Sequence, residues 1–307
     1  MKAKIFVLFF FISSIFLSTS AFSQSDTTLK LLIVTAHPDD DAAFSGMVYQ
    51  FTHLLHGKAD LCLVTNGEGG YKYSTLAEDI YGLELTDEEV GRKYLPEIRK
   101  KELIAGCKIV GIKDFYFLEQ KDHKYTNNIP EVLDSVWDVP YITKRLEEIL
   151  KNGKYNYVLV LPPTKTTHAH HSSAGILALR VISGMKLKNR PVILAGSGRN
   201  LIDTSYTDYS GLEGYPETKI YSDAPVFSFD RTTPFGFNNA LNFKIISNWV
   251  IAEHKSQGTM QLLMNRGDIE MYSYFAINDP AKIESTKDLF ERLKAIQFKK
   301  KEYNNLN

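Results

Sequence analysis

The chain has 307 residues, and its 36 lysine and arginine residues are balanced by 36 aspartate and glutamate residues. A formal charge of zero with no basic block argues against a nucleic-acid-binding protein, because contacts to phosphates require clustered cations. An apolar fraction of 44% allows a sizeable core, and the length predicts one large domain or two small ones.

The N-terminus has the pattern of a secretory signal peptide. Lys2 and Lys4 precede an apolar run from residue 5 to residue 17, and small residues follow it up to Ser23. The run is shorter than the roughly 20 residues of a membrane-spanning helix. We therefore expect residues 1–23 to be a cleaved signal peptide and the mature protein to be periplasmic or secreted, with no stable membrane anchor. An uncleaved anchor is the alternative.

Alternating strand and helix patterns follow. Continuous apolar strands separated by amphipathic helices predict an α/β fold, in which a mostly parallel sheet carries helices on both faces. The predicted strands are 31–36, 61–65, 115–118, 157–161 and 192–195, and the predicted helices are 42–55, 88–110, 141–150 and 174–182.

The pattern changes near residue 200, so that we expect a domain core of about 30–200 and a C-terminal extension of 201–307. Residues 203–234 are rich in Tyr, Thr, Pro, Gly and Asp. A helix at 242–254, a strand at 271–276 and a charged terminal helix follow. We interpret the extension as a mixed cap segment on the same domain, 24–307.

Two cysteines are present, Cys62 in a predicted strand and Cys107 in a predicted helix. We expect both to be buried as free thiols, which behave as small apolar side chains. Because an exported protein can form disulfides, a bridge between them is the alternative.

Polar segments follow three of the predicted strands, at residues 37–41, 65–71 and 166–171. Ligands bind at the carboxyl ends of the strands in open parallel sheets, so these segments are expected to meet at one edge. Imidazole and carboxylate ligands suit zinc, and also iron or manganese. His37 and Asp40 are spaced to reach one ion, and a histidine from 166–171 would complete three ligands.

Two simpler interpretations stay open at this point. The aspartates at 39–41 could cap a helix that begins at residue 42, since Asp favours helix N-termini. The histidines at 168, 170 and 171 could lie in an exposed surface loop.

Several short motifs resemble those of the PIG-L/LmbE-like family of zinc-dependent N-deacetylases. That family has A-H-P-D-D-E after its first strand and H-x-D-H further on. The resemblance extends from about residue 31 to residue 257 and implies a Rossmann-like fold and N-acetylated amino sugars as substrates. The matching segments here are Ala36-His37-Pro38-Asp39-Asp40, Thr65-Asn66-Gly67-Glu68-Gly69, Arg99-Lys100-Lys101-Glu102, His168-Ala169-His170-His171 and Ala252-Glu253-His254-Lys255-Ser256-Gln257.

The resemblance implies a role for individual residues. His37, Asp40 and His171 would bind one Zn²⁺, with Fe²⁺ or another divalent metal as alternatives. Asp39 would be the general base that activates the attacking water. His168 would stabilise the oxyanion or help to protonate the leaving amine.

Arg99 and Asp122 lie where family members contact substrate, and His254 belongs to a late motif that we expect to support the site. Two positions depart from the family pattern. Asp41 stands where the family has glutamate, and His170 replaces the aspartate of H-x-D-H. That aspartate can orient a catalytic histidine or raise its basicity, so its loss predicts a lower pKa for His168.

Deacetylation of a GlcNAc-type sugar is therefore the expected activity, on a small-molecule or glycan substrate. Two alternatives remain. One is a related amidase that cuts a larger conjugate, and the other is a zinc-containing carbohydrate-binding protein whose catalysis is weakened by His170. The presence of Asp39 favours an enzyme, because binding alone does not require a base.

Overall fold

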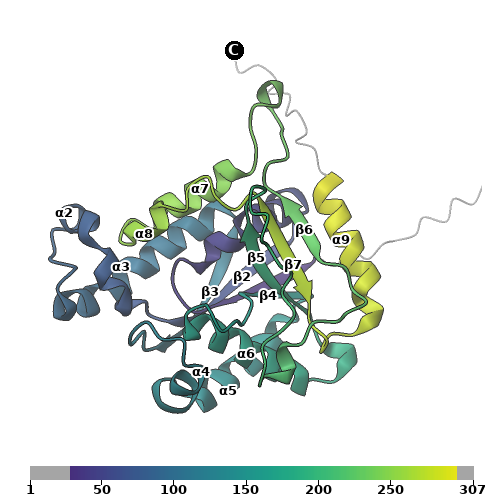
Figure 1. Cartoon of the computed structure of the whole chain (residues 1–307), viewed down its shortest axis with the longest axis horizontal. Helices are drawn as coiled ribbons and strands as arrows, with labels where there is room; N and C mark the ends of the chain where they lie inside the picture. The colour runs from purple at the N-terminus through teal and green to yellow at the C-terminus, as the bar shows by residue number, and fades with distance from the viewer. Residues whose placement is uncertain (1–27, 296–307) are drawn as a thin grey trace, which may run out of the picture.

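The computed structural model describes residues 28–295, so the predicted signal peptide at 1–23 lies outside the described residues. Within 28–295 the chain forms a seven-stranded sheet in the order β3-β2-β1-β4-β5-β7-β6 (Figure 1). The strands are β1 (Lys30–Thr35), β2 (Lys58–Thr65), β3 (Ile112–Gln120), β4 (Tyr157–Val160), β5 (Val192–Arg199), β6 (Phe227–Asp230) and β7 (Ile269–Tyr274).

Strands β1 to β5 are parallel to one another, and β7 pairs antiparallel with both β5 and β6. The carboxyl ends of the five parallel strands therefore lie at one edge of the sheet. The two antiparallel strands come from the C-terminal extension, which completes the sheet as well as covering it.

Helices cover both faces of the sheet, with α3 and α7 on one side and α5 and α6 on the other (Figure 1). Alternate residues of β1 enter the two cores: Leu31 and Ile33 pack with one, and Leu32 and Val34 with the other. This double coverage explains why the strand is apolar at successive positions. The α-helices are α1 (Ser45–Tyr49), α2 (Glu78–Tyr81), α3 (Glu88–Ile109), α4 (Ile129–Glu131), α5 (Val139–Gly153), α6 (Ala169–Gly184), α7 (Lys244–Glu253), α8 (Gly258–Gln261) and α9 (Ile283–Ala295).

The predicted α/β fold with a mostly parallel sheet is confirmed. Cys62 and Cys107 are buried and unpaired, as expected. No helix in the described part of the chain combines the length and the apolar character that crossing a bilayer demands.

Two local predictions were wrong. The predicted helix 42–55 is broken into a 3₁₀ helix η1 (Asp40–Phe44), α1 and a π-helix η2 (Gln50–Leu54). Helix α6 begins at Ala169 instead of 174, because its N-cap is His168, a residue that does not usually mark a helix start. Strand β6 was not predicted and lies within residues 203–234.

A buried ion pair attaches the C-terminal strands to the helix that follows β1. Nε of Arg231 lies 2.6 Å from Oε1 of Glu270, and both side chains are at most 5% exposed. Glu270 also accepts from the backbone N–H of Gly46 at 2.8 Å, and Arg231 donates to the carbonyl of Ala42 at 3.0 Å. The C-terminal extension thus holds the start of η1 and α1 in place.

The substitution Glu270→Gln should lower the free energy of unfolding by about 3–5 kcal/mol, because it leaves the buried charge of Arg231 without a counter-charge. Urea denaturation monitored by circular dichroism measures the change. The control is Glu284→Gln, which removes an exposed carboxylate paired with Lys287 and should change stability little. Equal free energies of unfolding for the two variants would contradict a stabilising role of the ion pair between Arg231 and Glu270.

Candidate metal and catalytic site

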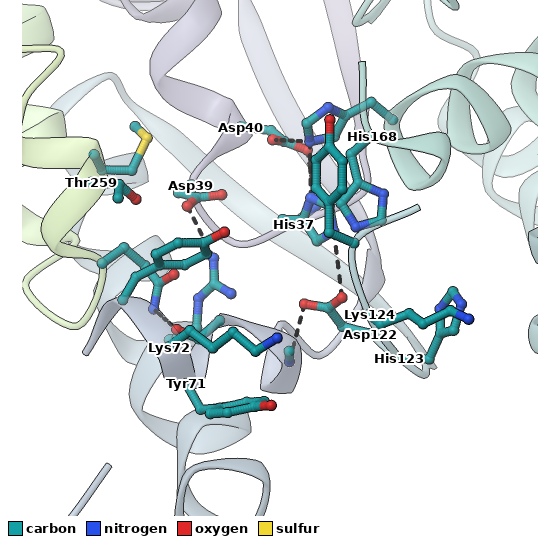
Figure 2. Close-up of a pocket in the computed structure, with 18 of the residues that line it drawn as sticks. His37, Asp39, Asp40, Tyr71, Lys72, Asp122, His123, Lys124, His168 and Thr259 are labelled. Atoms are coloured by element: carbon teal, nitrogen blue, oxygen red, sulfur yellow. Dashed lines mark hydrogen bonds and ion pairs between the residues drawn. The ribbon is translucent and has the colours of Figure 1, made fainter. Parts of the chain in front are cut away.

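A cavity of about 800 Å³ opens at the carboxyl edge of the parallel strands. The segments that follow β1, β2, β3 and β4 all contribute to its walls, so the structure brings together the polar segments as the sequence predicts. Figure 2 shows His37, Asp40 and His168 grouped on one side and Tyr71 and Lys72 on another. The lining of the cavity includes His37, Asp39, Asp40, Gly69, Tyr71, Lys72, Arg99, Asp122, His123, Tyr125, His168 and His171.

The carboxylate of Asp40 is fixed by the turn that ends β1. Its Oδ2 accepts from the backbone N–H of Ala36 at 3.0 Å and of His37 at 2.9 Å. Asp39, at the N-cap of η1, makes no side-chain capping bond. Helix capping therefore does not account for these two aspartates, and Oδ1 of Asp40 is directed elsewhere.

His37, Asp40 and His171 present ligand atoms that all lie within 4.8 Å of one another. Nδ1 of His37 is 2.9 Å from Nε2 of His171, which is 3.1 Å from Oδ1 of Asp40. Nδ1 of His171 lies 2.9 Å from the hydroxyl of Thr167, which can accept its proton and leave Nε2 as a lone pair. Two imidazoles and one carboxylate fit a catalytic zinc site with an open position.

Asp39 lies beside this group and pairs with a buried arginine. Nη2 of Arg99 is 3.0 Å from Oδ2 of Asp39, while Nη1 donates to the carbonyl of Gly67 at 2.6 Å. Burial raises the pKa of Asp39, and the guanidinium of Arg99 opposes that rise without cancelling it. Arg99, expected at the substrate, is therefore also the partner of the predicted base.

His168 caps helix α6, because its Nδ1 accepts from the backbone N–H of His170 at 3.1 Å. Burial, reinforced by the neighbouring His170 and His171, lowers the pKa of His168 to about 3. The prediction from the missing aspartate named this direction, but the largest cause of the shift is burial. His168 is thus neutral near pH 7, with its proton on Nε2, and is a hydrogen-bond donor rather than an acid.

The remaining predicted residues lie behind or beside the three candidate metal ligands, His37, Asp40 and His171. Asp41 is buried, with Oδ1 at 3.1 Å from Nε2 of His254 and Oδ2 at 3.6 Å from Sγ of Cys107. Asp122 accepts from the backbone N–H of Gly69 at 3.1 Å and lines the cavity. The structure thus places Asp41 and His254 away from the cavity lining, and Asp122 within it.

Other cavity residues were not predicted. His123 follows Asp122 at the end of β3, and Tyr71 and Lys72 belong to the 3₁₀ helix η3 (Glu68–Tyr73) after β2. The same edge argument applies to the end of β3, a fourth parallel strand, and would have identified His123.

Comparison with known proteins identifies a family that this chain resembles. Residues 32–182 match the model of the family described as PIG-L, GlcNAc-PI de-N-acetylase. Two proteins named "Probable N-acetyl-alpha-D-glucosaminyl L-malate deacetylase 2", from Bacillus cereus and Bacillus subtilis, are each 26% identical, over 54% and 52% of this chain. The matches span 66% and 64% of the length of these relatives.

A solved structure supports the fold alone. A deacetylase triple mutant from the teicoplanin biosynthetic pathway is 16% identical and gives a TM-score of 0.50, covering 82% of this chain and 100% of its own. The match of residues 32–182, about half of the chain, to the PIG-L family model confirms the resemblance that the sequence motifs predicted.

Proposed function

We propose that this protein is a metal-dependent N-deacetylase that acts on a GlcNAc-type amino sugar. The observation that carries the proposal is that His37, Asp40 and His171 line the same cavity as Asp39 and His168. Metal-dependent hydrolysis of an amide requires a set of metal ligands, a general base and a hydrogen-bond donor for the oxyanion. The family description and the names of the Bacillus relatives support the same activity.

The proposed metal is a single Zn²⁺, with Fe²⁺ or another divalent ion as alternatives, held by His37, Asp40 and His171. When bound, it would polarise the acetyl carbonyl and lower the pKa of water. Asp39 takes a proton from the attacking water, and its raised pKa makes it a better proton acceptor than an ordinary aspartate. Arg99 holds the carboxylate in position through their contact at 3.0 Å.

His168 is placed to donate a hydrogen bond from Nε2–H to the oxyanion of the tetrahedral intermediate. Of its two predicted roles, this one suits a histidine that is neutral near pH 7. The proton taken by Asp39 then passes to the leaving nitrogen as the C–N bond breaks. The first products are acetic acid and the free amine, and transfer of the acid's proton to the amine gives acetate and the ammonium form of the amino sugar. Protons and charge therefore balance without a further reactant.

The walls of the cavity suit a sugar. Tyr71, Lys72 and Tyr125 line it, and aromatic rings with an apolar face and a polar tip pack well on sugar rings. A volume of about 800 Å³ has room for a sugar and part of its carrier. Substrates of the named relatives carry GlcNAc on malate, and the retained Asp39 favours turnover over binding alone.

We further propose that the protein is exported, on the strength of the N-terminal sequence pattern. Expression of the full chain in a Gram-negative host should yield a periplasmic protein whose N-terminus begins after Ala21 or Ser23. A protein that keeps Met1 and stays in the cytoplasm would refute export.

The substitution Asp39→Asn should reduce the rate of acetate release from N-acetylglucosamine conjugates by about 10²–10⁴-fold, the usual worth of a general base. Zinc content should be unchanged, because Asp39 is not among the metal ligands. Asp288→Asn, on the distant helix α9, is the matched control and should leave the rate unaltered. Unchanged turnover in Asp39→Asn would refute its role as base.

The substitution Arg99→Gln should move the acid limb of the kcat/KM profile to higher pH. Arg99 lowers the pKa of Asp39, so its removal raises that pKa further, and a base is lost as pH falls through its pKa. Arg99→Lys keeps the positive charge and should leave the limb closer to that of the parent. A limb that stays in place, or moves to lower pH, in Arg99→Gln would contradict this pairing.

A further inference from the structure

His170, which replaces the family aspartate, connects the proposed metal group to a second histidine and a carboxylate. We propose that His170 and His123, together with Glu131, form a hydrogen-bonded relay that fixes the tautomer of His37 and presents its Nδ1 lone pair to the metal. The inference rests on the proposed metal site and adds positioning residues to it.

The relay is a continuous chain of contacts between side chains from four segments. Nε2 of His37 lies 3.1 Å from Nδ1 of His170, and Nε2 of His170 lies 3.0 Å from Nδ1 of His123. Nε2 of His123 then lies 3.4 Å from Oε1 of Glu131. Each of the three imidazoles therefore uses both of its nitrogens, and His170 is completely buried.

The carboxylate at the far end favours one direction of the chain. A neutral imidazole has one N–H and one lone pair, whereas an ionised carboxylate only accepts. Glu131 stays ionised because hydrogen bonds from Lys124 and Thr126 lower its pKa to about 2. The contact with Glu131 is therefore favourable when His123 donates through Nε2–H, and Nδ1 of His123 then accepts.

The same donor and acceptor requirement applies to the imidazoles of His170 and His37. His170 donates to His123 through Nε2–H, which leaves its Nδ1 as an acceptor facing His37. His37 then donates through Nε2–H and keeps a lone pair on Nδ1. That nitrogen is the one 2.9 Å from Nε2 of His171, within the proposed metal group. The relay thus gives His37 the tautomer that a metal ligand needs.

Asp122 is the group that competes with this direction. Its Oδ1 lies 3.4 Å from Nδ1 of His170 and 3.8 Å from Nε2 of His37. A proton on Nδ1 of His170 would reverse the chain and turn a lone pair of His123 onto the carboxylate of Glu131, which is repulsive. The proposed direction turns the Nδ1 lone pair of His170 toward Oδ1 of Asp122 at the same distance of 3.4 Å, so the two carboxylates oppose each other. A metal bound by His37 selects the proposed direction, because only that direction leaves the Nδ1 lone pair of His37 free for it.

The relay also explains how the chain tolerates its departure from the H-x-D-H pattern. An aspartate at position 170 would supply a negative acceptor directly. Here His170 supplies a neutral acceptor, and Glu131, two hydrogen bonds further on, stabilises the tautomer that accepts. Trp137, with its ring centroid 5.1 Å from that of His170, restricts the imidazole plane.

Nitrogen-15 NMR of the histidine rings in the zinc-loaded protein tests the tautomers without reference to activity. We expect His123, His170 and His37 each to carry the proton on Nε2, with no proton on Nδ1. A proton on Nδ1 of His170 would overturn the proposal. Histidine signals that do not change when zinc is added would instead refute the proposed metal site, so the two failures are distinguishable.

Zinc affinity, measured by competition with a chromophoric chelator, tests the consequence for the metal group. His123→Leu breaks the relay and should weaken binding by about 10–100-fold, the usual effect of removing a partner of a metal-bound histidine. His123→Gln can both accept and donate, and should retain most of the affinity. The control is His56→Asn, between η2 and the start of β2, which should bind as the parent does.

Each outcome of the affinity measurement is informative. Parent affinity in His123→Leu would overturn the relay while leaving the zinc site intact. A parent that binds no zinc would refute the proposed metal group instead. A second equivalent of zinc that is lost in His170→Gln would mean that Asp122, His168 and His170 hold an ion, which would also overturn the relay.

Discussion

The repulsion between three adjacent carboxylates is the constraint on which the rest of this structure depends. Asp39, Asp40 and Asp41 follow the central strand β1, and each is stabilised by a different segment. Asp39 contacts Arg99 of α3, Asp40 contacts His171 of α6 and the backbone of its own turn, and Asp41 contacts His254 after α7. The charges of the turn are therefore compensated by contacts that only the complete fold provides.

Helix α3 connects several of these contacts. Arg99 contacts both Asp39 and the carbonyl of Gly67, while Glu102 accepts from the backbone N–H of Ser256 at 2.7 Å and from its hydroxyl at 2.6 Å. Motifs far apart in the sequence are thus paired in space through one helix. The ion pair between Arg231 and Glu270 likewise attaches the C-terminal strands to the helical segment after β1. The C-terminal strands therefore support the site as well as the sheet.

The sequence was sufficient for features that depend on local pattern. Apolar runs identified the parallel strands, and the edge rule together with the family motifs placed His37 and His171 in one cavity. Features that depend on long-range partners were not accessible. The start of α6 was hidden because its cap is His168, β6 forms only by pairing with β7, and the role of His123 depends on contacts to His170 and Glu131 that no local pattern encodes.

The central claim is that His37, Asp40 and His171 hold a metal that the reaction requires. The most direct test is to remove metal from the purified protein with a chelator, add zinc back in steps and measure acetate release at each step. The account predicts no release without metal and recovery that saturates at one equivalent per chain, with no recovery in Asp40→Ala. Full acetate release from the metal-free protein would contradict it.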